Sequence, residues 1–476
     1  MAQAVIRLEP LGATVSTEVG APLREVLFDF GVEFPCGGDG RCKRCRVRVL
    51  EGQLEGGDCG DGWRLSCRAS VSGNVTLEIG QWESNILSDE TPFDFEPRRG
   101  LGVAIDLGTT TLVAQLVDLQ TASVLGVRTA LNPQARYGAD VMTRVQYALS
   151  ADGLGTLAAL IRRELGRMIA ELVEDRATPS VVTIVGNTVM QHLFCGFDVA
   201  PLAAAPFEPL HMEEEEFSAR SLEWPRASGA AIRFLPNLGG FVGSDVLAGI
   251  VATGLAERDD VTVLVDLGTN GEIVIGNRER MICASTAMGP AFEGGRISCG
   301  MRAATGAISA VEVGGGELRC HVIGGGRARG ICGSGLVDAV ACGLEIGAIR
   351  QNGRMAEPLA LTDGLEISQA DVRQVQLAKG AIAGGLRVLQ RRFGGNVRRV
   401  SLAGAFGNYI NVRSARRIGL LEFAEELIQP SGNTALLGAK RALFGEIAAS
   451  VEHVALAADP EFEDAYISAM SFAEAI

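Results

Sequence analysis

VAIDLGTTTLVAQLVD, at residues 103–118, is followed later in the chain by a second stretch of the same design, VLVDLGTNGEIVIGN at residues 263–277. In each stretch an apolar run ends in Asp-Leu-Gly-Thr, turns, and returns as another apolar run. Apolar runs of this length on either side of a glycine turn are typical of buried strands joined in a hairpin. The pattern therefore predicts a duplicated α/β unit in the chain after residue 100.

Each turn carries groups that suit a phosphate and its metal ion. Glycine lets the backbone approach a phosphate, and threonine hydroxyls and backbone N–H groups can donate hydrogen bonds to its oxygens. Asp106 and Asp266, at the strand ends, can hold Mg²⁺ through water or orient an attacking water. Asp-Leu-Gly-Thr alone is only a good tight turn, so it is the presence of two copies in matching contexts that indicates nucleotide chemistry.

A third segment, VSLAGAFG at residues 400–407, indicates a strand that runs into a glycine turn against which an adenine could lie. Two further segments, at residues 237–250 and 330–344, fit helices that link the halves. Together these features resemble the superfamily of sugar kinases, heat-shock chaperones and actin. The resemblance covers residues 101 to about 470, and it implies two ribonuclease-H-like halves that close on ATP and Mg²⁺.

The resemblance implies roles for individual residues. Asp106 matches the acid of the first phosphate motif and Asp266 that of the second. Asp245 lies where some relatives carry a catalytic acid, although it can equally be an acid at the start of the helix that follows. The nucleotide-binding residues that the motifs imply are Gly108, Thr109, Thr110, Gly268, Thr269, Asn270, Gly404, Ala405 and Gly407.

Four of the first five cysteines form a pattern near the N-terminus. Cys36, Cys42 and Cys45 have the spacing C-x5-C-x2-C, and Cys67 follows. Four soft thiolates suit an iron–sulfur cluster or zinc, but the second C-x2-C pair of a zinc ribbon is missing. The stretch resembles the 2Fe–2S ferredoxins, with four unrelated buried thiols as the alternative. Cys59, in an exposed-looking loop, is interpreted as a bystander.

The flanking sequence agrees with a β-grasp ferredoxin. Residues 5–8 and 14–19 alternate like the strands of a hairpin, residues 22–30 suggest a short helix, and strands are expected at 45–50 and 75–79. A stretch without periodicity then indicates a linker. The expected fold class is α+β, with a 2Fe–2S ferredoxin-like domain at 1–82, a linker at 83–100, and the two ribonuclease-H-like α/β halves of an ATPase at 101–255 and 256–476.

Composition and charge exclude some partners. The 476 residues carry a net charge of −14, which argues against nucleic acid because phosphate binding needs a positive surface. The chain opens without a charged leader, and its most apolar stretches carry aspartates, so we expect neither a signal peptide nor a membrane span. An odd number of cysteines, 11, indicates a reducing cytoplasm, with most thiols used for packing.

The segment ASTAMGPAFEGGRISCGM, at residues 284–301, gathers glycine, proline and hydroxyl groups, which predicts a loop after the second hairpin. Such a loop could sense nucleotide and meet a partner, with Ser285 or Thr286 as a polar contact. A purely structural turn is the alternative.

The order of ferredoxin, linker and ATPase, together with GNTVMQHLF (186–194), NLGGFVGSD (237–245) and GPAFEGGRIS (289–298), resembles the reductive activators of corrinoid proteins. That family implies an ATP-hydrolysing enzyme that transfers one electron from its cluster to a Co(II) corrinoid protein, regenerating Co(I) for methyl transfer. A low-potential electron donor is implied as a further partner. The short linker predicts that the separate middle domain of longer relatives is absent or vestigial.

Two other functions stay open. The protein could deliver electrons to another enzyme, such as a dehydratase, or it could be a non-catalytic redox sensor whose cluster state sets nucleotide occupancy. The assembly also stays open, with a homodimer as one form.

Overall fold

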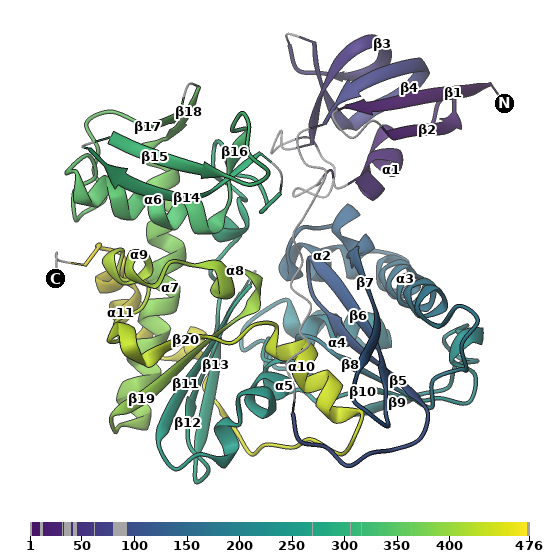
Figure 1. The fold of residues 1–476 in the computed structure, drawn as a ribbon, viewed down its shortest axis with the longest axis vertical. Helices are drawn as coiled ribbons and strands as arrows, with labels where there is room; N and C mark the ends of the chain where they lie inside the picture. The colour runs from purple at the N-terminus through teal and green to yellow at the C-terminus, as the bar shows by residue number, and fades with distance from the viewer. Residues whose placement is uncertain are drawn as a thin grey trace.

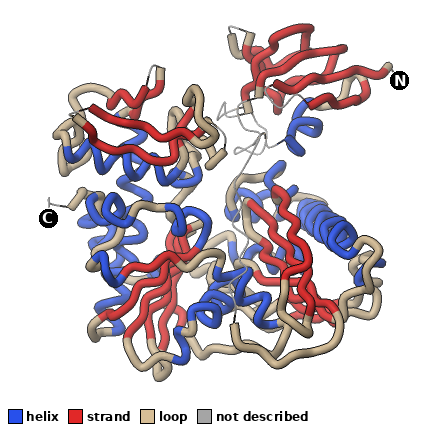
Figure 2. Tube along the Cα trace, in the orientation of Figure 1, coloured by secondary structure: helices blue, strands red, loops and turns tan. Residues whose placement is uncertain are grey.

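The computed structural model of the protein describes residues 2–9, 13–30, 32, 40, 45–60, 62–79, 93–268, 270–304, 306–315, 317–362 and 364–473, without the side chains of Asp29 and Ala405. Figure 1 shows a small β-sheet domain at the N-terminus beside two larger lobes. Each lobe has a sheet of its own with helices packed around it (Figure 2).

The N-terminal domain consists of β1 (Gln3–Glu9), β2 (Ala13–Glu18), α1 (Leu23–Leu27), the 3₁₀ helix η1 (Phe28–Phe30), β3 (Arg46–Asp58) and β4 (Trp63–Glu78). Alternation along β1 directs Ala4, Ile6 and Leu8 into the core. The strand order is β2-β1-β4-β3, and β1 pairs parallel with β4 but antiparallel with β2. This arrangement confirms the expected β-grasp, although β3 and β4 extend beyond the strands expected from the sequence.

The first lobe contains the strands β5 (Leu101–Leu107), β6 (Thr111–Asp118), β7 (Val124–Leu131), β8 (Val181–Val185), β9 (Glu215–Phe217) and β10 (Ala231–Phe234). The second lobe contains β11 (Val261–Leu267), β12 (Gly271–Gly276), β13 (Met281–Thr286), β19 (Val397–Ala403), β20 (Ile428–Pro430) and β21 (Glu452–His453). The sheet orders are β7-β6-β5-β8-β10-β9 and β20-β19-β11-β12-β13-β21.

The two sheets have the same core topology. In each, the first strand lies centrally, antiparallel to the second and parallel to the fourth: β5 between β6 and β8, and β11 between β12 and β19. The third strand lies beside the second in both lobes, and the outer neighbour of the fourth strand is β10 in the first lobe and β20 in the second, each paired in parallel. The repeat seen in the sequence is therefore a duplication of the whole ribonuclease-H-like sheet.

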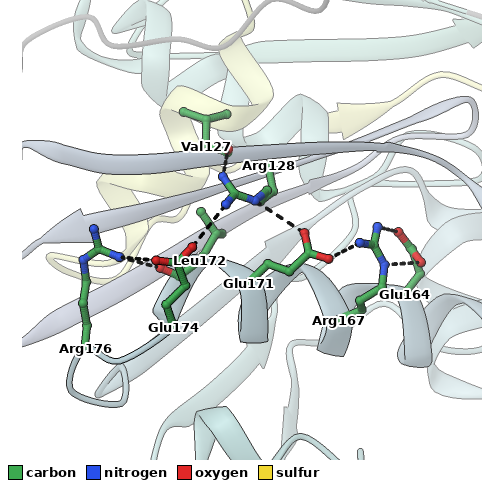
Figure 3. Close-up of polar contacts among 8 residues, drawn as sticks. All are labelled: Val127, Arg128, Glu164, Arg167, Glu171, Leu172, Glu174 and Arg176. Atoms are coloured by element: carbon green, nitrogen blue, oxygen red, sulfur yellow. Dashed lines mark hydrogen bonds and ion pairs between the residues drawn. The ribbon is translucent and has the colours of Figure 1, made fainter. Parts of the chain in front are cut away.

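Helices α2 (Val141–Ala148), α3 (Gly153–Val173) and α4 (Thr188–Cys195) pack in the first lobe. The face of α3 that is buried carries Leu157, Ile161 and Leu165, four residues apart, as expected of an amphipathic helix. At its far end, Arg128 of β7 forms ion pairs with glutamates of α3, part of the network drawn in Figure 3. These pairs are exposed and contribute little to stability, so the apolar face holds the helix in place.

The second lobe carries an insertion after β13, built from β14 (Ala307–Gly314), β15 (Glu317–Val322), β16 (Gly330–Ile331), α6 (Gly333–Glu345), β17 (Leu359–Thr362) and β18 (Leu365–Ile367). The long helix α7 (Gln369–Phe393) follows and begins with a capping box between Ser368 and Asp371. The remaining helices are α8 (Gly404–Tyr409), α9 (Val412–Arg417) and α11 (Phe462–Ala469).

Two helices are exchanged between the lobes (Figure 1). Helix α5 (Ser244–Thr253), at the end of the first lobe, packs Val246 against Leu264 of the second sheet. Helix α10 (Thr434–Ala442), near the C-terminus, packs Leu436 against the first sheet. The helices cross at Gly438, where a Cβ atom would lie 2.2 Å from the carbonyl oxygen of Ala248. Glycine at this position permits the close crossing.

The assignment of residues 330–344 to a linking helix is wrong. Residues 333–345 form α6, which packs against β14 and α9 inside the second lobe, and the partner of α5 is α10. Nearly every residue of α6 is buried. The elements of the second lobe around α6 bury it. Its apolar sequence therefore reflects packing within that lobe and not an interface between the lobes.

Contacts among the described residues join the N-terminal domain and the linker to the first lobe and to α10. In the 3₁₀ helix η2 (Pro133–Arg136), the guanidinium of Arg136 lies 2.7 Å from a carboxylate oxygen of Glu25 and 4.5 Å from the centre of the Phe28 ring. Residues 93–98 form neither helix nor strand, and Phe93 and Phe95 pack beside α10. Among the described helices, none is both long and apolar enough to cross a membrane.

Candidate functional site

A cavity of about 300 Å³ is lined by both hairpins and therefore by both lobes. Asp106, Asp245 and Asp266 all line it, so the three predicted acids are brought together. The predicted binding residues that also line it are Gly108, Thr109, Thr110, Gly268, Asn270 and Gly404. Thr269 and the side chain of Ala405 lie outside the described residues, and Gly407 faces Leu402 and Leu267 instead of the cavity.

The first hairpin is closed by a hydrogen bond from the Gly108 N–H to the Thr111 carbonyl, at 3.1 Å. A Cβ at Gly108 would lie 2.4 Å from that carbonyl oxygen, so the tight turn requires glycine. Asn187, the N-cap of α4, donates from Nδ2 to the hydroxyl of Thr109 at 2.9 Å. The turn is thereby held against the start of a helix.

The second hairpin has a different environment. The Gly268 N–H donates to the Asn270 carbonyl at 3.0 Å. Gly404, at the start of α8, has a φ of +81°, and a Cβ there would lie 2.6 Å from Oδ1 of Asp266. Glycine at 404 therefore serves both a left-handed backbone and the close approach of the Asp266 carboxylate.

Four of the carboxyl groups that line the cavity have a raised pKa. Burial raises the pKa of Asp106 to about 6, and a hydrogen bond from Asn433 opposes part of that shift. Burial and the charge of Asp106 raise the pKa of Asp266 to about 7. Burial and the charge of Asp266 raise the pKa of Asp245 to about 8. Burial, with Asp245 and Asp266 nearby, holds the pKa of Glu272 well above its usual range.

This donor set fits the Mg²⁺ that accompanies ATP. Carboxylate oxygens are the ligands that Mg²⁺ takes in proteins, and a bound cation would relieve the repulsion that raises these pKa values. Asp106 and Asp266 each bring a carboxylate to the cavity, one from each lobe. Asp245 lies in the first turn of α5 and also lines the cavity. It is therefore both an acid at the start of that helix and a residue of the candidate site.

Glu272 and Asn433 line the cavity but were not predicted. Glu272 lies directly opposite Asp266 in the β11–β12 pairing and is only 8% exposed. A lone charge in an otherwise apolar strand is the signal that could have revealed it. Asn433 gave no such signal, because its contact with Asp106 joins residues 327 positions apart.

The expected adenine side of the cavity combines Gly404 with Phe406 of α8. The Phe406 ring is stacked on Phe292 with centroids 4.7 Å apart. Gly333 and Ser334, at the N-terminus of α6, line the same cavity. An aromatic surface beside a helix N-terminus suits a base and its phosphates.

Ser285 and Thr286 do not form the expected loop surface. Both belong to β13, where Thr286 is buried and donates to the Gly271 carbonyl. Ser285 is half-buried and donates to Glu272 at 3.4 Å. Their hydroxyls therefore support the second hairpin, and the prediction that Thr286 offers its side chain to a partner is wrong.

The described part of the N-terminal domain places two of the four predicted cluster ligands in adjacent positions. Cys45 is buried, and its carbonyl accepts hydrogen bonds from the N–H and hydroxyl of Ser66, the residue before Cys67. Cys45, just before β3, and Cys67, in β4, therefore lie near each other, which fits a thiolate-ligated cluster. Cys36 and Cys42 lie outside the described residues, and Cys59 is exposed, as expected.

Protein-family models match three consecutive segments. Residues 6–72 match a 2Fe-2S iron-sulfur cluster binding domain, residues 101–258 match the RACo middle region, and residues 260–475 match the C-terminal domain of RACo, the ASKHA domain. The middle-region model falls on the first lobe and not on a separate domain between the 2Fe-2S domain and that lobe.

Relatives with named functions are similar to this protein along most of its chain. "Corrinoid activation enzyme RamQ" of Eubacterium limosum is 33% identical over 82% of this chain and 73% of its own length. "[Co(II) methylated amine-specific corrinoid protein] reductase" of Methanosarcina barkeri is 28% identical over 78% of this chain and 77% of its own. A solved structure, "Reductive activator for corrinoid,iron-sulfur protein", has a TM-score of 0.71 at 25% identity and covers 98% of both chains. The chain belongs to this RACo family of reductive activators, in which a 2Fe–2S domain is joined to an ASKHA domain.

Proposed function

We propose that the protein is an ATP-dependent reductive activator that passes one electron from its 2Fe–2S domain to a Co(II) corrinoid protein. The carrying observation is that one chain joins a cluster-binding domain to a cavity in which carboxylates of two lobes face two phosphate-type hairpins. The names of the relatives support the corrinoid partner. The predicted boundaries at 82, 100 and 255 belong to this proposal, and the matched segments support them.

In the nucleotide site, the two hairpins bind and orient the phosphates. Backbone N–H groups and the hydroxyls of Thr109 and Thr110 would donate to phosphate oxygens, and Asp106 and Asp266 would hold the accompanying Mg²⁺. Bound Mg²⁺ neutralises charge on the phosphates. Asp245, which also lines the cavity, would orient the attacking water. Because the site is shared by both lobes, hydrolysis changes how tightly they are held together.

The proposed reaction transfers one electron from the N-terminal domain to the cobalt of the partner. The N-terminal domain loses one electron, and the cobalt of the partner gains it and falls from Co(II) to Co(I). A low-potential donor must then reduce the N-terminal domain again. Every 59 mV by which the step is uphill costs about 1.4 kcal/mol, and ATP can supply this only if one nucleotide state binds one corrinoid state more tightly than the other.

The test is a mixture of protein, reductant, Mg²⁺, ATP and a purified Co(II) corrinoid protein, followed by its visible spectrum. We expect Co(I) absorbance that depends on ATP and is lost in the Asp266→Asn variant. Formation of Co(I) at the same rate without ATP would contradict ATP dependence. Tight nucleotide binding without any turnover in the presence of the partner would favour the redox sensor.

The homodimer and the cytoplasmic location are part of the same proposal. The reducing environment implied by an odd cysteine count supports the location. Sedimentation of the full chain with and without the corrinoid protein tests the dimer, since a single monomeric species in both conditions would exclude it.

A further inference from the structure

Asn433 connects the catalytic centre to α10. Its Nδ2 donates to Oδ2 of Asp106 at 2.9 Å, while its Oδ1 accepts from the N–H of Leu436 at 2.9 Å and so caps the helix. One amide therefore fixes both a nucleotide-site carboxylate and the first turn of α10. A change in the environment of Asp106 therefore alters the hydrogen bonding of the residue that caps α10.

Helix α10 is short and firmly bound along its length. Leu436 and Ala439 are buried against the first sheet, Arg441 donates to the Val251 carbonyl of α5 at 2.7 Å, and Arg233 donates to the Ala442 carbonyl at 3.0 Å. At 1.5 Å per residue, the 9 residues of α10 span about 14 Å. Over such a length a packed helix moves as one body.

The linker packs against the C-terminal end of α10 and against Phe444, which follows the helix. The Phe444 ring lies 4.8 Å from that of Phe95 and 5.5 Å from that of Phe93, between centroids. The cationic groups of Lys440 and Arg441 lie 5.4 and 5.5 Å from the centre of the Phe93 ring. Aromatic pairs and cation–π contacts of this geometry are attractive beyond the area they bury.

This clasp, Phe93 and Phe95 on Phe444, lies on the tether of the N-terminal domain. Asp94 and Glu96 alternate with the two phenylalanines and are exposed, so the segment presents one apolar face to α10. The Arg98 N–H also donates to the Leu119 carbonyl at 2.9 Å. Residues 93–98 of the tether, the linker to the N-terminal domain, are therefore packed on the first lobe and α10.

We propose that Asn433 is a positioning residue for Asp106, and that α10 transmits nucleotide occupancy to the clasp and thereby to the tether of the 2Fe–2S domain. The inference rests on the proposed function, because it explains how an ATP site controls an electron carrier. Mg²⁺ competes with the amide of Asn433 for the carboxylate of Asp106. Release of that amide lets α10 shift, and Phe93 and Phe95 follow.

The first test needs neither cluster nor corrinoid. Amide hydrogen exchange of residues 94–98 is measured with and without a non-hydrolysable ATP analogue and Mg²⁺. In the wild-type chain we expect nucleotide to change exchange by about tenfold or more. Asn433→Ser keeps a capping oxygen but is too short to reach Asp106, and it should abolish the response while the analogue still binds. A full response in Asn433→Ser would overturn the proposal.

The second test uses the clasp. In the double variant Phe93→Ala/Phe95→Ala, we expect basal ATP hydrolysis within about twofold of wild type, together with loss of the ATP stimulation of Co(I) formation. The matched control is Asp94→Ala/Glu96→Ala, which alters the exposed face of the same segment and should keep the stimulation. Full stimulation in the phenylalanine variant would overturn the coupling. Absence of stimulation in wild type would instead refute the proposed function, while the exchange experiment still decides the inference.

Discussion

The two hairpins of the cavity share Asp-Leu-Gly-Thr and the same strand pairing, but their polar neighbours differ. Around the first hairpin the partners are amides, since Asn433 donates to Asp106 and Asn187 donates to Thr109. Around the second they are acids, with Glu272 opposite Asp266 in the sheet. Within the part of the chain that the structure describes, no side chain donates a hydrogen bond to Asp266.

The difference shows that duplication preserved the backbone of the site while its polar surroundings diverged. The first hairpin is arranged by neutral donors before any ligand arrives. The second lies among like charges, which is unfavourable until protons or a cation compensate them. We infer that the first lobe supplies a preformed grip and the second supplies most of the attraction for Mg²⁺.

The largest effect is expected from Asp266→Asn. Loss of the carboxylate from the acidic hairpin should lower ATP hydrolysis by about two to three orders of magnitude, because metal stabilisation of the transition state is worth several kcal/mol. Steady-state rates across a Mg²⁺ titration measure it. Activity within tenfold of wild type at saturating Mg²⁺ would show that the second hairpin is not the main cation site.

Glu272→Gln should have a smaller effect, lowering kcat by about ten- to hundredfold with little change in KM, as for groups that support a metal ligand. The matched control is Ser285→Ala, which removes only the hydroxyl that donates to Glu272. If both variants have the same modest effect, Glu272 is a packing residue. The acidic character of the second hairpin would then depend on Asp266 and not on Glu272.

The pH dependence of stability should separate the acids from the rest of the protein. Their ordinary pKa of 3.8 is raised to about 6 at Asp106 and about 7 at Asp266, so the folded state binds protons that the unfolded state releases. Their stabilising contribution is full below about pH 4 and is lost progressively as pH rises to about 7. The nucleotide-free protein should therefore melt several degrees lower at pH 8 than at pH 5.5.

The same melting series in the Asp106→Asn/Asp266→Asn variant is the control. It should depend less on pH, and Mg²⁺ with nucleotide should flatten the wild-type profile as well. A wild-type profile identical to that of the variant would mean that these acids do not carry the raised pKa values.

The smallest effect is expected from Thr109→Val, which removes the hydroxyl held by Asn187. Loss of one neutral hydrogen bond, worth about 1 kcal/mol, should raise the KM for ATP several-fold and leave kcat nearly unchanged. Thr121→Val, at an exposed turn of the same lobe, is the control. A fall in kcat would mean that the amide-supported hairpin takes part in the chemistry and not only in binding.

The fold could be predicted because its signals are local. The paired hairpins, the strand at 400 and the cysteine spacing all lie within short windows, and each proved to belong to the expected element or domain. The three acids could be predicted for the same reason, since two of them end strands of a repeated pattern. Local signals are the ones that periodicity and turn chemistry reveal.

The errors concern tertiary contacts. Helix α10 was missed as the partner of α5, because nothing within residues 434–442 says which sheet its apolar face will cover. Ser285 and Thr286 were placed on a loop, but glycine and hydroxyl groups occur here at the end of a buried strand. Asn433 reaches its partner only after the whole second lobe has been formed. No pattern within one element carries that information.

The exchange of α5 and α10 has a consequence for synthesis of the protein. The first lobe leaves the ribosome with one face of its sheet bare, since α10, which covers Val113 and Val185, is encoded near the C-terminus. At roughly 5–20 residues per second, that helix arrives some tens of seconds later. Until then the nascent lobe exposes an apolar surface of the kind that chaperones bind. Premature termination anywhere before residue 434 would leave this surface permanently uncovered.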